Sequence, residues 1–329
     1  MKVEIIRAFG PPSVFKKEEI PKPKIRPHHL LIHVKATSVN QIDCKIRAGL
    51  VPAIAPDLPA ILHGDVAGVI SEVGPQVTGF KEGDEVYACA GGVKGTGGAL
   101  AEYMLADSAC VAKKPKSLSF AQAAALPLVT ITAWTALFLK AQVKPDSHLL
   151  IHGGVGGVGH IGVQLAHWAG AHVTATVGSD EDFALAKKFG AQNVINFRTE
   201  TVADYVQRIT QGKGFDLIFD TVGGKNLDLS FQAAALNGVV ATTVARSTHD
   251  LSPMHQKGLS LHVIFMLIPL LTHQDLKHQG EILQKAAQLA DEGALIPLID
   301  PHPFSIADAA KAHEYLESGQ AKGKVVLIA

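Results

Sequence analysis

Three glycines spaced as G-x-G-x-x-G are the residues of this chain whose chemistry is easiest to identify. Gly154, Gly156 and Gly159 follow an apolar run at residues 148–152 and open a segment with helical periodicity. In a strand–turn–helix unit the first glycine permits a tight turn, the second lets the backbone approach a pyrophosphate, and the third lets the helix pack on the strand. Free N–H groups at the start of the helix then face the negative charge. This context predicts a dinucleotide-binding site.

The residues after the next predicted strand bear on which dinucleotide binds. An NAD site usually offers a carboxylate about 20 residues past the glycines, and here that position is Ser179, between Gly178 and Asp180. A small residue and a hydroxyl suit a 2′-phosphate better than a carboxylate does. Asp180 and Asp182 favour NAD instead, unless they only occupy the first turn of the next helix, where acidic residues are stabilising. We therefore predict NADP(H), with NAD as the open alternative.

The elements that must position this loop alternate between strand and helix. Short apolar runs predict strands, and apolar residues three and four apart predict helices. The predicted strands cover residues 148–152, 172–177, 193–197, 215–221 and 238–244, and the predicted helices cover residues 158–169, 181–189, 202–210 and 226–235. Such alternation predicts a parallel sheet covered on both faces.

The chain before Pro115 has a different character. It contains short β-type runs, at residues 30–36, 66–73 and 85–89, separated by glycine and proline. We expect a β-rich domain there, followed by helical segments at residues 119–140, 280–292 and 306–318 and a last strand at residues 324–328.

Composition excludes several classes of protein. The 329 residues carry 30 Lys plus Arg and 30 Asp plus Glu, and this zero balance argues against a nucleic-acid binder. With 47% hydrophobic and 18% charged residues the chain is globular rather than disordered.

The cysteines and the apolar segments bear on location. Cys44, Cys89 and Cys110 are too few and too scattered for a disulfide framework, so we expect a reducing compartment, most simply the cytoplasm. The first ten residues carry charges where a signal peptide needs an apolar run. The apolar run at residues 261–271 is shorter than a membrane span, which needs roughly 20 residues, and is interpreted as a buried strand and its following turn.

Stretches along nearly the whole chain resemble one enzyme family. They lie at residues 40–43, 64–70, 98–103, 126–127, 132–134, 153–159, 215–216, 220–224 and 323–327. The sequence resembles the zinc-independent, zeta-crystallin-like quinone oxidoreductase branch of the medium-chain dehydrogenase/reductase superfamily. The resemblance implies an α/β protein with a GroES-like β-rich catalytic domain, residues 1–122 and 296–329, and a Rossmann doubly wound parallel-sheet domain, residues 123–295, with the active site in the cleft.

Zinc alcohol dehydrogenases are the nearest competing class. The resemblance places Asn40 where those relatives have a ligand cysteine, Gly64 where they have a ligand histidine, and Leu128 near a further ligand cysteine. Asp65 alone keeps a ligating group, while catalytic zinc needs about three protein ligands. We therefore predict a zinc-free enzyme, with a site rebuilt from His63 and Cys44 as the alternative.

The resemblance also implies roles for individual residues. Asn40 would lie by the nicotinamide, with Thr130 near the cofactor and Ser179 at the 2′-phosphate. Phe197 would pack by the adenine end, whereas Val222 and Thr243 would flank a ribose or only pack the sheet. The residues expected along the pyrophosphate are Gly153, Gly154, Val155, Gly156, Gly157, Val158 and Gly159.

Two positions depart from the family pattern. Asp182 stands where many relatives have a lysine that grips the 2′-phosphate, which weakens the expectation of NADP. Lys45 stands where some relatives have an active-site tyrosine, and it is either a catalytic donor or a solvated surface residue.

These features predict an enzyme that passes hydride from NADPH, without metal or flavin, to a quinone or to the C=C bond of an α,β-unsaturated carbonyl. Asn40, backbone amides and Lys45 are the candidate donors to the developing oxyanion. The alternatives are a zinc-dependent alcohol dehydrogenase and a non-enzymatic nucleotide-binding scaffold. The family also implies a homodimer, and the apolar run at residues 263–271 supports it, since it exceeds what one edge strand needs.

Overall fold

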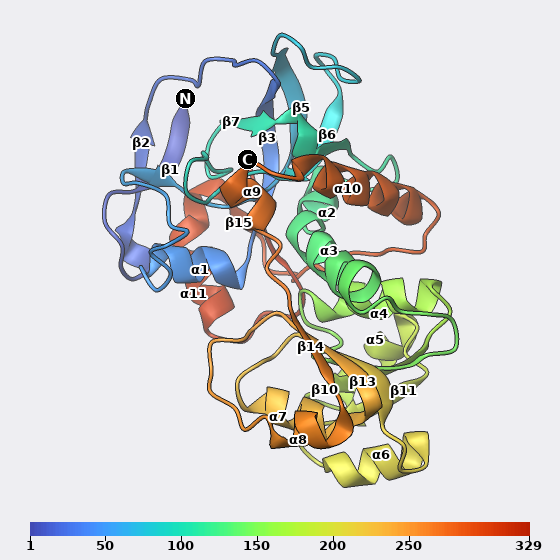
Figure 1. The fold of residues 1–329 in the computed structure, drawn as a ribbon. Helices are drawn as coiled ribbons and strands as arrows, with labels where there is room; N and C mark the ends of the chain where they lie inside the picture. Colours follow the sequence, from blue (N-terminus) through green and yellow to red (C-terminus); the bar gives the residue numbers. More distant parts are fainter. The chain divides into compact units, whose positions relative to one another are not determined.

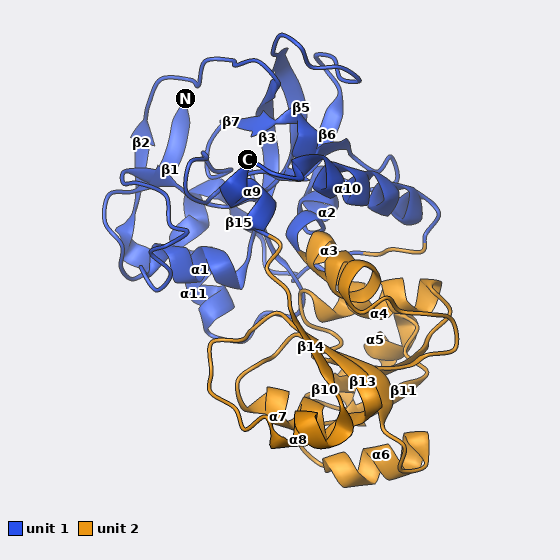
Figure 2. Cartoon of the chain, in the orientation of Figure 1, with its two compact units in different colours: residues 1–128, 267–293, 297–329 blue, residues 129–266, 294–296 orange.

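The computed structural model describes residues 1–329, and the chain forms two compact units (Figures 1 and 2). Unit 1 contains residues 1–128, 267–293 and 297–329, and unit 2 contains residues 129–266 and 294–296. The expected nucleotide-binding domain included residues 267–293, which instead pack in unit 1. The reason is a helix, α10 (Leu276–Asp291), that lies on the β-rich part of the chain, where Tyr87 Oη donates to the carbonyl of Leu283 at 2.5 Å.

Unit 2 is built on one parallel sheet of six strands. Their spatial order is β11-β10-β9-β12-β13-β14, so the order reverses beside β9, as in doubly wound dinucleotide-binding sheets. The strands are β9 (His148–His152), β10 (His172–Val177), β11 (Asn193–Asn196), β12 (Phe215–Asp220), β13 (Ala234–Thr242) and β14 (Ser260–Val263). The first four in chain order begin where the sequence predicts them.

Helices connect these strands, as parallel pairing requires. They are α4 (Gly159–Trp168), α5 (Glu181–Lys188), α6 (Val202–Thr210), α7 (Lys225–Ala233) and α8 (Ser252–Lys257). Before them α3 (Pro127–Trp134) enters the unit and continues as the π-helical turn η3 (Thr135–Lys140). Buried apolar side chains such as Leu150, Phe215, Ile218, Phe231 and Val240 form a core beneath the helices.

Unit 1 contains two sheets that are almost entirely antiparallel. The small sheet has the order β2-β1-β4, and the larger one has the order β15-β16-β3-β5-β6-β8, with β7 also paired to β3. Their strands are β1 (Lys2–Ile6), β2 (Phe15–Glu19), β3 (His29–Val39), β4 (Ala60–Ile61), β5 (Asp65–Val73), β6 (Glu85–Cys89), β7 (Tyr103–Asp107), β8 (Val111–Lys113), β15 (Phe304–Ser305) and β16 (Val325–Ile328).

The helices of unit 1 are short apart from α10. They are α1 (Gln41–Arg47), α2 (Phe120–Ala124), α9 (Ile268–Thr272), α11 (Ala309–Glu317) and the single turns η1 (Pro12–Val14), η2 (Ser108–Cys110) and η4 (Ile306–Asp308). The β16 strand pairs with β3, so the last residues of the chain lie beside residues 36–39. This pairing brings the C-terminal segment to the start of α1.

The apolar run at residues 261–271 differs from the expectation. Only Ser260–Val263 forms a strand, and the rest of the run is a turn followed by α9, which Pro269 opens. The strand is the last in its sheet, so one side has no neighbour, and Val263 is 53% exposed. The interpretation as a buried strand was therefore wrong. None of the helices has both the length and the apolar character needed to cross a bilayer.

Candidate functional site

The glycine loop joins β9 to α4, and each glycine meets a different constraint. Gly153 has φ +71°, a conformation that favours glycine, so the tight turn falls one residue earlier than the motif suggests. A Cβ at Gly154 would lie 2.6 Å from the Cβ of Ala175 on β10, and one at Gly159 would lie 2.0 Å from the carbonyl oxygen of Gly153. Gly156 is exposed, and a Cβ there would meet only that same carbonyl, at 3.2 Å.

The loop also presents backbone donors without acceptors. The N–H groups of Gly153 and Gly154 donate to Thr176 on β10 and so anchor the turn. The N–H groups of Val155, Gly157 and Val158 donate to no atom of the chain. Together with the N-terminus of α4 they form a cradle whose chemistry fits a pyrophosphate.

Ser179 lies at the other end of this region, between β10 and α5. Its hydroxyl donates to the carboxylate of Asp182 at 2.8 Å. Asp182 is in the first turn of α5, and this hydrogen bond places its carboxylate at the expected 2′-phosphate position. The ring of Phe197 lies beside Gly178, 3.3 Å from where a Cβ would stand.

Arg198 was missed by the sequence analysis. Its Nε lies 3.8 Å from the Cβ position of Gly178, its side chain is exposed, and its guanidinium makes no ion pair. Arg198 follows β11, the strand next to β10, and the carboxyl ends of parallel strands lie at one edge of the sheet. That position in the sequence could have indicated that Arg198 lies near Ser179.

The other expected cofactor residues of unit 2 are more dispersed. Thr130 is fully buried, and its hydroxyl has no hydrogen-bonding partner, which is rare for a buried polar atom and fits contact with a bound group. Val222 is 52% exposed, and its methyl lies 3.6 Å from the Cβ position of Gly153. Thr243 is half-buried, and its backbone N–H donates to the carbonyl of Asp220.

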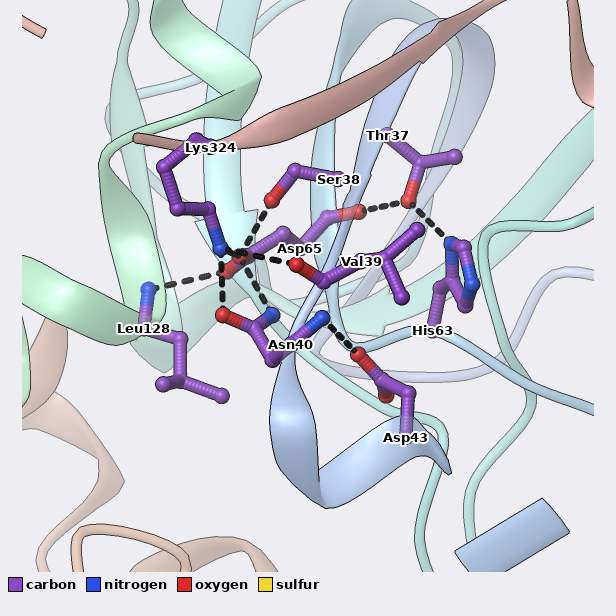
Figure 3. A network of polar contacts seen from close by, with 9 residues as sticks. All are labelled: Thr37, Ser38, Val39, Asn40, Asp43, His63, Asp65, Leu128 and Lys324. Carbon is purple, nitrogen blue, oxygen red and sulfur yellow. Dashed lines mark hydrogen bonds and ion pairs between the residues drawn. The ribbon is translucent and has the colours of Figure 1, made fainter. Parts of the chain in front are cut away.

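In unit 1, Asn40 is the N-cap of α1, where β3 ends, and it belongs to a buried polar network (Figure 3). Its Nδ2 donates to Asp65 Oδ2 at 2.8 Å, and its Oδ1 accepts from the ammonium of Lys324. Lys324 also donates to the carbonyl of Val39 and lies 3.5 Å from the Asp65 carboxylate. These contacts fix which end of the amide is nitrogen.

The network leaves Asn40 one donor. An amide NH₂ has two N–H groups, and Asp65 takes one, so one remains to bind an external oxygen. Lys324 on the amide oxygen withdraws electron density and strengthens that remaining donor. Sequence reasoning missed Lys324, which lies 284 residues from Asn40.

The expected zinc-ligand positions come together around Asp65. The N–H of Leu128 donates to Asp65 Oδ1 at 2.8 Å, and Ser38 and Asn40 donate to Oδ2. A Cβ at Gly64 would lie 2.8 Å from the carbonyl oxygen of Gly91 and 3.1 Å from Cys89 Sγ, so no ligand side chain fits there. The residues at these positions therefore do not fit a catalytic zinc.

Two other residues of α1 bear on the charge of this site. Asp43 accepts from the backbone N–H of Asn40 at 2.7 Å, and burial raises the pKa of its carboxyl to about 7. Lys45 is half-buried in the last turn of α1, and its ammonium makes no hydrogen bond or ion pair.

His63 and Cys44 contact a third residue, His313 of α11. His63 Nε2 lies 2.9 Å from His313 Nε2, and Cys44 Sγ lies 3.4 Å from His313 Nδ1. Since they contact opposite nitrogens of one ring, they do not converge on a common ion. No group of three or more Cys, His or acidic side chains in the chain is arranged to hold a metal.

The hydrogen bonds of this buried group run in one direction. Thr37 donates to the carbonyl of Asp65 at 2.6 Å, so it accepts from His63 Nδ1–H at 3.2 Å. His63 Nε2 then accepts from His313 Nε2–H, and His313 Nδ1 accepts from the thiol of Cys44. Every member is therefore neutral.

The titration of this group agrees with that assignment. Burial lowers the pKa of His63 well below its ordinary value, and the neighbouring His313 lowers it further. Burial lowers the pKa of His313 to about 3, and the charge of Arg47 adds to this effect. Burial also raises the pKa of Cys44 to about 12. The backbone of His63 has φ +72°, a conformation that costs free energy for residues other than glycine.

The chain matches two family models and resembles several known proteins over nearly its whole length. Residues 26–116 match a family model described as the alcohol dehydrogenase GroES-like domain, and residues 189–327 match one described as a zinc-binding dehydrogenase. The chain is 35% identical to 2-methylene-furan-3-one reductase of Solanum lycopersicum, over 97% of this chain and 76% of that protein. It is 32% identical to a quinone oxidoreductase of Pongo abelii, over 97% of this chain and 95% of that protein.

Solved structures of related proteins superimpose on the whole chain. An alcohol dehydrogenase superfamily protein from Novosphingobium aromaticivorans superimposes with a TM-score of 0.95 at 37% identity, covering 100% of this chain and 99% of that one. The quinone oxidoreductase of Escherichia coli in complex with NADPH superimposes with a TM-score of 0.87 at 28% identity, covering 100% of each chain.

Proposed function

Because the chain belongs to the quinone oxidoreductase branch of the medium-chain dehydrogenase/reductase superfamily, we propose that it transfers hydride from NADPH to quinones or to the C=C bond of α,β-unsaturated carbonyl compounds. It is an oxidoreductase with a GroES-like domain and a Rossmann-type parallel sheet. We propose further that the enzyme uses no zinc and that Asn40 and Lys45 act on the acceptor.

One observation carries the choice of acceptor. The positions around Asp65 offer hydrogen-bond donors and no metal ligand set, and Asn40 keeps one N–H free. A saturated aldehyde places a full alkoxide charge on one oxygen, which zinc relatives stabilise with the metal. A conjugated acceptor spreads the charge over an enolate or a quinol oxygen, so amide donors suffice.

The cofactor is proposed from the shape and chemistry of unit 2. The free N–H groups of Val155, Gly157 and Val158 would hold the pyrophosphate, and the buried hydroxyl of Thr130 would bind nearer the nicotinamide. When bound, NADPH supplies the hydride. Arg198 would pair with the 2′-phosphate, whereas Asp182 opposes it, so the proposed preference for NADPH over NADH is modest.

Asn40 and Lys45 are proposed to act on the acceptor. Asn40 would donate its remaining N–H to the acceptor oxygen, in an orientation that Asp65 and Lys324 hold, so the donor needs little reorganisation during the reaction. Lys45 would add a second donor from α1. Water would supply the final proton.

Two further proposals concern assembly and location. The outer edge of β14 has no partner strand, and Val263 and Phe265 beside it are 53% and 41% exposed, which supports a homodimer formed along this edge. All three cysteines are free thiols and buried, which supports a reducing compartment such as the cytoplasm.

The test is a turnover comparison with the purified protein. NADPH and NADH oxidation is measured with 1,4-quinones, alkyl vinyl ketones and saturated aldehydes, with product analysis to identify the reduced bond and metal analysis of the same sample. We expect turnover of conjugated acceptors only, unaffected by chelators. Aldehyde reduction that depends on stoichiometric zinc would establish an alcohol dehydrogenase instead, and cofactor binding without any turnover would establish a scaffold.

A further inference from the structure

A second cluster of reactive side chains lies in unit 2, apart from the glycine loop. Ser247 and His249 belong to the segment between β13 and α8, and Asp228 belongs to α7 (Figure 1). Ser247 Oγ lies 2.5 Å from His249 Nε2, and His249 Nδ1 lies 2.7 Å from Asp228 Oδ1. This is the order of contacts found in nucleophile–base–carboxylate triads.

The carboxylate sets the tautomer of the histidine. Asp228 can only accept, so Nδ1 carries a proton, and in the neutral imidazole Nε2 carries a lone pair. In that form the hydroxyl of Ser247 donates to Nε2, and the imidazole is placed to remove its proton.

The base and the nucleophile differ in their exposure to solvent. The His249 side chain is only 9% exposed, and its ring packs edge-on against the buried Phe231 with centroids 6.2 Å apart. Ser247, by contrast, is exposed. The base is thus packed against the protein while the nucleophile is open to a reagent, an arrangement that suits general-base activation.

The surroundings offer donors and an apolar surface. The backbone N–H groups of Ser247, Thr248 and His249 donate to no atom of the chain, so they are available to a developing oxyanion. Leu229, next to Asp228, is 42% exposed, and Leu251, two residues after His249, is 57% exposed. Uncharged esters with an alkyl or aryl group suit such a neighbourhood.

We propose that Ser247 is an activated nucleophile that is acylated by small activated esters and hydrolyses them. Ser247 Oγ forms a bond to the ester carbonyl carbon, and its proton passes to His249 Nε2. The tetrahedral species collapses with loss of the alkoxide or phenoxide, which either takes the proton from His249 or leaves as the anion while His249 releases that proton to solvent. Water then attacks the acyl-serine with His249 as base, which releases the acid and restores the hydroxyl.

The experiment uses p-nitrophenyl acetate and the full-length protein without NADPH. Release of p-nitrophenolate is followed, and acetylation is located by mass spectrometry of peptides. We expect acetyl on Ser247 and a rate that falls about 10-fold or more in Ser247→Ala and His249→Gln, with a smaller loss in Asp228→Asn. The matched control is Ser252→Ala, which removes another exposed hydroxyl nearby in the chain and should keep the rate.

Two results would overturn the proposal. One is a wild-type rate no higher than that of Ser247→Ala, and the other is acetylation spread over lysines with none on Ser247. Melting temperature and NADPH binding, measured on every variant, separate loss of the nucleophile from loss of the fold. The hydride-transfer proposal stands or falls independently, because this assay contains no nicotinamide.

Discussion

Replacement of the buried His313 by glutamine should change how stability depends on pH. His313 lies in the neutral chain of hydrogen bonds from Cys44 to Thr37, and its pKa is lowered to about 3 from an ordinary value of 6.5. A base whose pKa is lowered in the folded state binds fewer protons there than in the unfolded chain. Its contribution to stability is therefore complete well above pH 6.5 and is lost progressively as the pH falls through that value.

The size of the effect follows from the two pKa values. In the unfolded chain an ordinary histidine goes from about a quarter protonated at pH 7 to nearly fully protonated at pH 5, whereas folded His313 stays neutral at both. Integrated over this range the loss is about 2 kcal/mol. It depends little on the folded pKa, because any value near 3 leaves the folded histidine neutral at pH 5.

Asp43 makes a direct measurement on the wild type uninformative. Its pKa is raised to about 7, so the folded state binds the extra proton and stability from this group rises as the pH falls from 7. That gain opposes the loss from His313. The difference between wild type and His313→Gln cancels the Asp43 contribution, and His63 remains in both proteins.

The assay is urea unfolding followed by circular dichroism at pH 7, 6 and 5 and constant ionic strength. At pH 7 the variant should be less stable by about 1–3 kcal/mol, because buried hydrogen bonds are altered. The gap should shrink by about 2 kcal/mol at pH 5. His255→Gln, at an exposed position on α8, is the control and should show a constant difference. A gap for His313→Gln that stays constant, or widens, would refute the neutral-chain assignment.

Four further predictions concern the proposed site and assembly. Asn40→Ala should lower kcat on enones by about 10-fold or more with the KM for NADPH unchanged, and an unaltered kcat would remove Asn40 from the mechanism. Gly156→Val should abolish NADPH binding in calorimetry without unfolding the loop, since that position is exposed; retained affinity would contradict the pyrophosphate assignment. Arg198→Ala should weaken NADPH binding more than NADH binding, and Asp182→Lys should strengthen NADPH binding through an ion pair with the phosphate; a wild type that prefers NADH tenfold would show that the aspartates bind the ribose. Val263→Asp should convert a dimer to monomers in light scattering, and a monomeric wild type at micromolar concentration would count against the β14 interface.

Some of this protein could be predicted from sequence because the relevant signals are local. The glycine loop occupies consecutive residues between a strand and a helix, and its backbone requirements are met within those residues and the adjacent β10. Hydrophobic periodicity likewise predicts most helices and strands of unit 2, since each element must bury one face. The fold class that this pattern predicts is confirmed, and so is the family, which the resemblance of stretches along the chain indicated.

The partners of the functional side chains were decided only by the tertiary structure. Lys324 meets Asn40 across 284 residues, and His313 meets Cys44 across 269. Such pairs arise when strand pairing and helix packing bring distant segments together, and no periodicity along the chain records them. The sequence alone could therefore name Asn40, His63 and Cys44 as chemically capable. Burial and hydrogen-bond geometry determined that Asn40 is an oriented donor and that the other two belong to a neutral buried chain.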